Sequence, residues 1–223
     1  MGKRRKDSQN KEFKPEGVKP VTAKTPNQKE YLLDIVDYDV VVCCGPAGSG
    51  KSFIAAGMAS DYLAKGKVDQ IVVVRPLVAS GEDVGALPGS IIEKMEPYLR
   101  PIKDHLKHFL GRNNYGQYIN SNQISFEPLE MMRGRTFDKS FILLDEAENC
   151  TLDQIKMLLT RMGQDSKVVI NGDIEQSDIG FKSGLETAMN RLQSVECVAI
   201  AELDEDDILR NGNIRDILDA LRG

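Results

Sequence analysis

The residues with the clearest chemical potential form one continuous run, Gly45-Pro46-Ala47-Gly48-Ser49-Gly50-Lys51-Ser52. This run matches the eight-residue P-loop pattern in full. Its glycines let the backbone curl so that several N–H groups point at one phosphate, and a following helix would present its positive N-terminus to the same anion. Lys51 should reach the β- and γ-phosphates, and Ser52 should ligate Mg²⁺ through its hydroxyl. The run therefore predicts that the chain binds ATP, or a related nucleoside triphosphate, together with Mg²⁺.

A second carboxylate for the metal is expected where the apolar run Phe141–Leu144 ends in Asp145 and Glu146. Asp145 would hold Mg²⁺ directly or through water. Glu146 is the better candidate for polarising an attacking water. A small-molecule kinase must exclude water, whereas a carboxylate beside the metal suits hydrolysis. The acid pair therefore favours a triphosphate hydrolase.

A third group of polar residues, Asn171-Gly172-Asp173 followed by Gln176, comes after the apolar run Val168–Ile170. A polar side chain at this strand end would be placed to sense the γ-phosphate and report hydrolysis. The same residues are also favourable in turns. Both interpretations remain open on the residues alone.

The elements that must position these groups alternate between strand and helix. Apolar, β-rich runs are found at Val40–Cys44, Ile71–Val74, Ile124–Phe126, Phe141–Leu144, Val168–Ile170 and Val195–Ile200. Most are continuously apolar, which is typical of strands covered on both faces. The pattern predicts an α/β fold with a parallel sheet and helices on both faces, whose ligands bind at the carboxyl ends of the strands.

Helical patterns separate the expected strands. One follows the P-loop from Ser52 to Leu63, and another spans Leu152–Met162 after a predicted capping box formed by Thr151 and Gln154, with Gly163 as its stop. The region Ser90–Leu110 is also helical in pattern. Pro97 and Pro101 are expected to break it.

Composition fits a globular protein with one ATPase domain over residues 25–223: the 223 residues are 41% hydrophobic and 28% charged. The net charge is −5, but residues 1–24 are basic. They are poor in apolar residues and are expected to be disordered. This tail is either simply solvated or a nucleic-acid-binding arm. No apolar run approaches the ~20 residues needed to span a bilayer.

The four cysteines, at positions 43, 44, 150 and 197, have no metal-ligand spacing. Reduced thiols in the cytoplasm are the simplest interpretation. Adjacent cysteines in a strand should point to opposite faces of the sheet.

Several further runs, taken with the P-loop and the acid pair, resemble the PhoH family of bacterial and phage P-loop ATPases, from about Thr25 to Arg222. They are Arg75-Pro76, Leu87-Pro88-Gly89, Pro97-Tyr98-Leu99-Arg100-Pro101, Met132-Arg133-Gly134-Arg135-Thr136, Leu144-Asp145-Glu146-Ala147, Leu159-Thr160-Arg161, Gly172-Asp173 with Gln176, and Ser183-Gly184-Leu185. The Met-Arg-Gly-Arg-Thr and Tyr-Leu-Arg-Pro runs are much more specific than the P-loop. One departure is Leu209-Arg210-Asn211, where the family usually has Val-Arg-His, so no role can be carried over for that histidine.

The resemblance implies a single ATPase core like that of superfamily 1 helicases, in the cytoplasm of a bacterium or a phage-infected host. It implies Gln28 as the adenine reader and Gln176 at the γ-phosphate. It also implies that Arg75 and the loop containing Arg133 and Arg135 lie near nucleic acid or phosphate.

The leading hypothesis is a Mg²⁺-dependent ATPase acting on, or stimulated by, RNA or single-stranded DNA. The basic tail and arginines support it, whereas the absence of Trp weakens it because aromatic rings usually stack on single-stranded bases. A ribonuclease and a nucleotide-dependent switch or assembly protein are the alternatives.

The length leaves room for only one ATPase core, so a positive group facing the γ-phosphate would have to come from a neighbouring subunit. A repeated head-to-tail contact closes into a ring, and we expect a hexamer. Arg161 and Arg210 are the candidate arginines for this catalytic role.

Overall fold

A computed structural model describes residues 17–77 and 91–208 of the chain. Its centre is one sheet of six strands in the order β3-β2-β4-β5-β1-β6, and every neighbouring pair is parallel. The strands are β1 (Val40–Cys44), β2 (Gln70–Arg75), β3 (Ile124–Pro128), β4 (Ser140–Leu144), β5 (Lys167–Gly172) and β6 (Val198–Glu202). Each expected strand is present. The sixth begins three residues later than expected and extends to Glu202.

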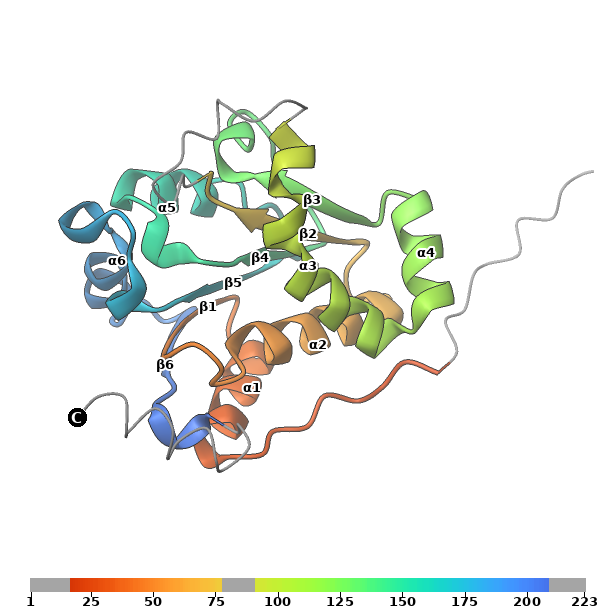
Figure 1. The fold of residues 1–223 in the computed structure, drawn as a ribbon, viewed down its shortest axis with the longest axis horizontal. Helices are drawn as coiled ribbons and strands as arrows, with labels where there is room; N and C mark the ends of the chain where they lie inside the picture. The colour runs from red at the N-terminus through yellow and green to blue at the C-terminus, as the bar shows by residue number, and fades with distance from the viewer. Residues whose placement is uncertain (1–16, 78–90, 209–223) are drawn as a thin grey trace, which may run out of the picture.

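Helices cover both faces of this sheet, as Figure 1 shows. One face carries α1 (Pro26–Asp37), α2 (Lys51–Ala64), α3 (Ile91–Leu110) and α4 (Arg112–Asn120). The other carries α5 (Leu152–Leu159) and α6 (Leu185–Leu192). The predicted α/β class, a parallel sheet between two helical layers, is confirmed.

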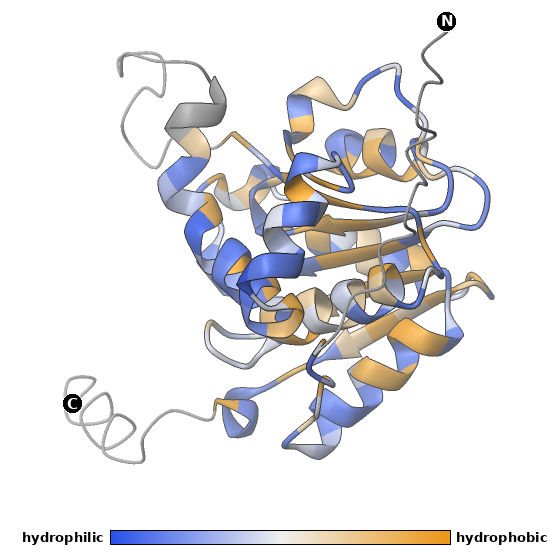
Figure 2. Cartoon of the chain, turned by 90° about the vertical axis from the view of Figure 1, so that its right-hand side faces the viewer, coloured by the Kyte–Doolittle hydropathy of each residue, from blue (hydrophilic) through white to orange (hydrophobic). Residues whose placement is uncertain are grey.

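The strands are apolar throughout because each side of the sheet is buried under its own helices. Val41 and Cys43 belong to the core under α1 and α2, while their neighbours Val42 and Cys44 face the core under α5 and α6. The two adjacent cysteines therefore point to opposite faces, as expected, and all four cysteines are free thiols. Figure 2 shows the hydrophobic strands enclosed by helices that carry both hydrophilic and hydrophobic residues.

The helical layer differs from the sequence prediction at two places. α3 runs through both Pro97 and Pro101 without a break. A proline removes one helical hydrogen bond, but the buried side chains of Leu99, Ile102 and Leu106 hold this helix against the sheet layer.

α5 has the predicted capping box of Thr151 and Gln154, but it ends at Leu159 rather than Met162. The next residues form tighter turns, with the Arg161 N–H donating to the Leu158 carbonyl at 2.8 Å.

The expected tail falls mostly outside the described residues, which begin at Gly17. Its last part, residues 17–24, lies along the domain in an extended form. The Lys19 N–H donates to the Phe109 carbonyl at 2.8 Å, and Val18 and Val21 are half-buried against the core. Among the described residues, no helix is long and apolar enough to cross a membrane.

Candidate nucleotide-binding site

Three of the predicted site segments meet at the carboxyl edge of the sheet. β5 lies between β1, which leads into the P-loop, and β4, which leads into the acid pair. The edge holds a pocket of about 330 Å³. Its lining comprises Ala47, Gly48, Gly50, Lys51, Ser52, Phe53, His105, Asp145, Glu146, Glu148, Asn171, Gly172, Asp173 and Gln176.

The P-loop forms the curled backbone that its glycines predict. Gly48 and Gly50 have φ angles of +87° and +98°, a region that side chains with a Cβ atom rarely adopt. Helix α2 begins immediately afterwards at Lys51, so its first free N–H groups open towards the pocket. The Lys51 ammonium donates to the carbonyls of Gly45 and Pro46, the latter at 3.0 Å. The loop thus offers backbone N–H groups and one cation to an anion.

Ser52 and Asp145 are in direct contact, although 93 residues separate them in the chain. The Ser52 hydroxyl donates to Asp145 Oδ1 at 2.7 Å. A hydroxyl and a carboxylate oxygen at the mouth of a P-loop are the ligands that Mg²⁺ accepts beside substrate phosphates. The two residues fit the predicted metal site, with Asp145 buried and Ser52 half-buried. No cluster of three or more His, Cys, Asp or Glu side chains suited to a metal occurs within the described ranges.

Burial raises the pKa of Asp145 above its ordinary value. The Arg75 guanidinium and the Ser52 hydrogen bond oppose this shift and favour the ionised carboxylate. Arg75 lies at the end of β2, beside β4. Its Nη1 is 3.6 Å from Asp145 Oδ2 and its Nη2 is 3.0 Å from Glu146 Oε1. It also donates to the Tyr98 carbonyl at 2.8 Å. The residue expected near nucleic acid or phosphate therefore lies against the two site acids.

Glu146 has a backbone conformation that is uncommon for a residue with a side chain. Its φ and ψ angles are 61° and 44°, in the left-handed region, and a short 3₁₀ turn follows at Ala147–Asn149. Such conformations cost of order 1–3 kcal/mol and cluster at functional sites. This turn directs the Glu146 side chain into the pocket while Asp145 stays buried.

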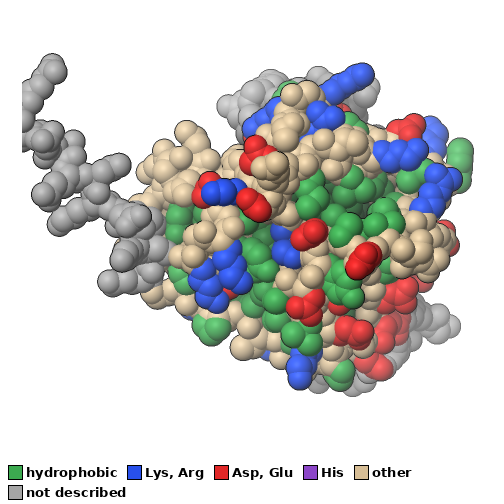
Figure 3. Space-filling model, turned by 180° about the vertical axis from the view of Figure 1, so that it is seen from behind, with side chains coloured by type: hydrophobic (Ala, Val, Ile, Leu, Met, Phe, Trp, Pro, Cys, Tyr) green, Lys and Arg blue, Asp and Glu red, His purple; other side chains and the backbone are tan. Residues whose placement is uncertain are grey.

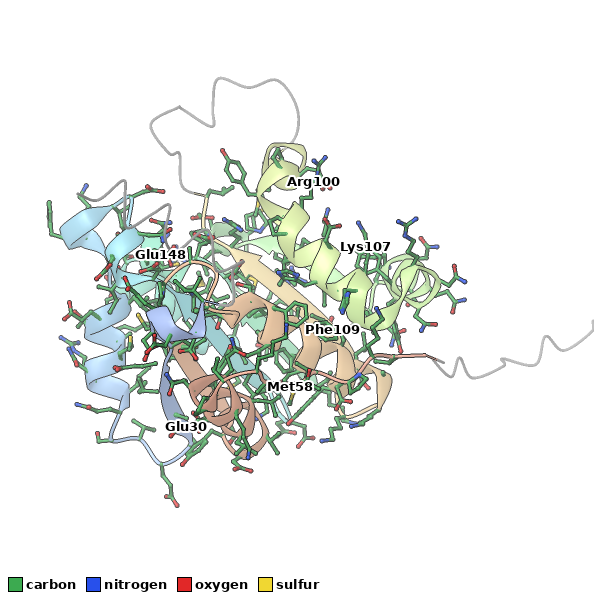
Figure 4. The ribbon with its side chains drawn as sticks, turned by 60° about the horizontal axis from the view of Figure 1, so that its bottom comes forward. Glu30, Met58, Arg100, Lys107, Phe109 and Glu148 are labelled. Atoms are coloured by element: carbon green, nitrogen blue, oxygen red, sulfur yellow. The ribbon has the colours of Figure 1, made fainter. Side chains whose placement is uncertain are left out.

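Glu148 is a buried acid that the sequence prediction missed. Its side chain accepts the Asp173 N–H at 3.0 Å, so it joins the segment after β4 to the end of β5. Burial, together with a hydrogen bond that the protonated Glu148 donates to the neighbouring Glu146 carboxylate, raises the pKa of Glu148 to about 8. Figure 4 labels it beside the segments that follow β4. The sequence shows an acid at this position close to Asp145, but no sequence signal distinguishes a buried acid here from a solvated one.

The two glutamines predicted from the family resemblance lie on opposite sides of the P-loop. Gln176 is exposed and lines the pocket, in the 3₁₀ turn after Asp173. Gln28 is buried, and its amide donates to the Ser49 carbonyl at 2.8 Å and to the Asp207 carbonyl at 3.3 Å while accepting the Lys24 N–H at 3.0 Å. Gln28 thus contacts the back of the P-loop in this structure. Its predicted role as an adenine reader stays a prediction.

The remaining predicted arginines lie away from the pocket. Arg133 is exposed, and Arg135 pairs with Glu127 at 2.9 Å and packs over the Phe137 ring. Arg161 donates to the carbonyls of Met157 and Arg135, both at 3.2 Å. Arg210 lies outside the described residues.

A second missed feature is an aromatic wall formed by helix α3 and the first turn of α2. The rings of His105 and Phe53 are 5.3 Å apart between centroids, and both line the pocket. Burial lowers the pKa of His105. No spacing rule links these two positions, because the contact depends on how α3 packs against α2.

Comparison with known proteins gives one consistent result. The family model described as PhoH-like protein matches residues 20–222. The chain is 40% identical over 204 residues to the PhoH-like protein of Bacillus subtilis (strain 168), covering 91% of this chain and 64% of that protein. It is 40% identical over 197 residues to Protein PhoH of Escherichia coli (strain K12), covering 86% and 55%.

The chain therefore spans only 55–64% of the length of these two relatives. Among solved structures, the large terminase from a thermophilic bacteriophage aligns with a TM-score of 0.49 at 12% identity, covering 87% of this chain and 49% of that one.

Proposed function

The chain belongs to the PhoH-like protein family, and from this premise we propose that it is a Mg²⁺-dependent ATPase whose turnover is stimulated by RNA or single-stranded DNA. Family membership and the P-loop site support a nucleotide-hydrolysing enzyme. The choice of ATP, the metal, the nucleic acid and the assembly are parts of the proposal.

One observation carries the hydrolytic part of the proposal: the 2.7 Å hydrogen bond between Ser52 Oγ and Asp145 Oδ1. It brings the hydroxyl at the start of the P-loop helix and the first acid after β4 to the same point. When bound there, Mg²⁺ would neutralise charge on the phosphate oxygens. Ser52 and Asp145 would hold it, and Lys51 would contact the phosphates from the loop.

Glu146 is the residue best placed to act on a water molecule. Its carboxylate lines the pocket beside Asp145 and is more exposed than that buried residue. Arg75 binds one of its oxygens at 3.0 Å and so limits the directions in which the carboxylate can point. A carboxylate held in this way can accept a proton from an attacking water.

Nucleic-acid binding is supported by exposed basic groups away from the pocket. Arg133 is exposed on the loop after β3, and Arg100 and Lys107 lie on α3, where Figure 4 labels them. Acidic side chains gather instead on the lower right of the face in Figure 3, where they would repel a phosphate backbone. We therefore propose that RNA or single-stranded DNA binds on the side of α3 and of the loop containing Arg133 and Arg135.

A ring, most simply a hexamer, is the proposed assembly. Arg161 follows α5, close to the start of β4, and so lies at the opposite end of the sheet from its own P-loop. It cannot reach the pocket of its own chain. A head-to-tail neighbour could use it, or Arg210, at the phosphates.

The test is the ATPase rate of the purified chain, measured with and without poly-ribonucleotide and single-stranded DNA over a range of salt concentrations. We expect Mg²⁺-dependent hydrolysis that rises with nucleic acid and loses this rise at high salt. Lys51→Ala is the matched inactive control. Tight nucleotide binding without hydrolysis under every condition would favour a nucleotide-dependent switch, and ATP-independent shortening of labelled RNA would favour a ribonuclease.

A further inference from the structure

Gln28, the residue expected to read adenine, already uses its side chain inside the protein. Its amide nitrogen donates to the carbonyls of Ser49 and Asp207, at 2.8 and 3.3 Å, and its oxygen accepts the Lys24 N–H at 3.0 Å. A side-chain amide has two N–H groups, so neither is left for a base. Gln28 is also 5% exposed and lies against Gly50, outside the residues that line the pocket. The base of a bound nucleotide therefore needs another partner.

The aromatic wall of Phe53 and His105 is the part of the lining that suits a base. Elsewhere in the described ranges, the lining consists of the P-loop, the acids after β4, the end of β5 and the turn after it. The P-loop would take the phosphates, and Asp145 and Glu146 the metal and the attacking water. Nucleobases stack on aromatic rings. Phe53 directly follows Ser52, so the wall begins beside the proposed phosphate and metal site.

The Phe53 ring is fixed from behind by α3. Its centroid is 5.3 Å from that of His105 and 5.6 Å from that of His108. It is 4.7 Å from the ring of Phe109, which is 1% exposed and labelled in Figure 4. Phe53 and His105 are each half-buried, and burial lowers the pKa of His105, which favours a neutral imidazole. The wall thus presents uncharged rings that a base can cover with little ordering of side chains.

Stacking and edge reading select bases to different extents. Every base has a π-face, so an aromatic ring accepts adenine and guanine to a similar degree. A site built to hydrogen-bond the edge of adenine would leave its own polar groups unpaired against guanine and would reject that base strongly. The engaged amide of Gln28 and the rings in the pocket favour stacking.

We propose that the base of the bound nucleoside triphosphate stacks on the aromatic wall of Phe53 and His105, rather than being read at its edge by Gln28, so that ATP and GTP bind with similar affinity. The inference rests on the proposed function, since it requires a triphosphate in the P-loop. It widens the substrate class from ATP to purine nucleoside triphosphates. It also gives the wall a role that the phosphate and metal site does not supply.

Binding constants separate the contribution of the base from that of the phosphates. Non-hydrolysable analogues of ATP and GTP are titrated with Mg²⁺ into the full chain, and inorganic tripolyphosphate, which has no base, is measured by competition with the ATP analogue. For the wild-type chain we expect the two analogues to bind within about threefold of each other and more tightly than tripolyphosphate. Phe53→Leu should weaken both analogues about five- to tenfold, because a stacked ring is lost, and change tripolyphosphate less than about twofold.

Phe181→Leu is the matched control, because the Phe181 side chain is 97% exposed and lies outside the pocket lining. It should change none of the three constants. Phe53→Tyr keeps the ring and should retain the affinity for both analogues. His105→Ala removes the second ring and should weaken both analogues about threefold, with tripolyphosphate unchanged. Melting curves establish that each variant is folded, and if Phe53→Leu is not, His105→Ala decides by the same comparison.

Wild-type affinity of both analogues for Phe53→Leu and His105→Ala would overturn the inference. An equal loss of tripolyphosphate would also overturn it, because the ring would then support the P-loop rather than the base. A preference of the wild-type chain for the ATP analogue of about tenfold or more, the value of a base-specific hydrogen bond, would restore edge reading. Wild-type protein that binds none of the three ligands would instead contradict the proposed function. The two failures are therefore distinguishable.

Discussion

Arg75 Nη2 lies 3.0 Å from Glu146 Oε1, so the end of β2 provides a cation to the residue that we propose acts on water. The same guanidinium is 3.6 Å from Asp145 Oδ2 and hydrogen-bonds the Tyr98 carbonyl on α3. One side chain thus connects α3 with both acids of the site.

The first prediction concerns this arginine. Arg75 lowers the pKa of Asp145 against the larger effect of burial, so Arg75→Ala should raise that pKa further. Asp145 must be ionised to hold a metal. The acid limb of the kcat/KM profile should therefore move to higher pH. A pH profile of ATP hydrolysis with saturating Mg²⁺ measures this shift.

Arg133→Ala is the matched control for Arg75→Ala. Loss of one phosphate contact should reduce the salt slope of single-strand binding by about 0.7 and leave the pH profile unchanged. Arg75→Ala should instead move the pH profile and leave the salt slope unchanged. A reduced salt slope for Arg75→Ala, with no movement of its pH profile, would place Arg75 at the nucleic acid, as the family resemblance implies.

The second prediction separates binding from turnover. Lys51→Ala should weaken both ATP binding and hydrolysis, because the ammonium would contact phosphate in the ground state and the transition state alike. Glu146→Gln should keep nucleotide affinity within a few-fold and slow turnover by about 10²–10⁴-fold. Equilibrium binding and steady-state rates on the same preparations test both. Near wild-type hydrolysis by Glu146→Gln would show that another group activates the water.

The third prediction concerns Glu148, whose pKa rises from 4.5 to about 8 on folding. Burial is the largest cause of this rise. Between these two values the unfolded chain has lost the proton while the folded chain keeps it. The stabilising contribution of Glu148 to the free energy of unfolding is therefore fully present below about pH 4.5 and decreases as the pH rises towards 8.

Glu148→Gln should remove this dependence, because an amide resembles the protonated acid and does not titrate. Melting temperatures of both proteins between pH 5 and 8, without nucleotide or Mg²⁺, test the difference between them. Groups that do not interact with Glu148 titrate equally in the two proteins and cancel. Parallel melting curves across this range would mean that Glu148 is ionised in the folded protein.

The fourth prediction compares two truncations. Removing residues 1–16 should leave the melting temperature nearly unchanged and weaken nucleic-acid binding, because six lysines and arginines are lost. Removing residues 1–24 also deletes Val18, Val21 and the Lys19 hydrogen bond to Phe109. That loss of about 2 kcal/mol should lower the melting temperature by roughly 4–8 °C. Equal melting temperatures would show that residues 17–24 contribute nothing to stability.

The fifth prediction tests the shared site of the proposed ring. Arg161→Ala and Lys51→Ala chains should each be inactive, and mixing them should recover part of the activity because some interfaces then pair an intact P-loop with an intact arginine. Light scattering with Mg²⁺ and a non-hydrolysable ATP analogue measures the assembly. A fully active monomer would contradict the ring.

The sequence was most informative where local patterns fix the structure. The P-loop, the acid pair and all six strands follow from residue types at short spacing, and the capping box at Thr151 was predicted to the residue. The continuous α3 was not, because its tolerance of Pro97 and Pro101 depends on packing against distant residues.

The same reason explains the missed parts of the site. Glu148, and the Tyr31 hydroxyl that donates to Asn171, acquire their character only when β5 enters between β1 and β4. Arg75 was singled out from the sequence, but its partners come from the end of a strand that is distant in the chain. Contacts of this kind are set by strand order, which the linear pattern leaves open.

The amide of Gln28 has a mechanical consequence for the chain. It hydrogen-bonds the Lys24 N–H, the Asp207 carbonyl and the Ser49 carbonyl at once. The segments at the two ends of the described chain are therefore linked to the P-loop by the same side chain. A displacement of either segment must break one of these hydrogen bonds or move the Gln28 side chain, which also contacts Ser49. The P-loop is thereby coupled to both ends of the described chain through one side chain, in addition to its direct connection to β1.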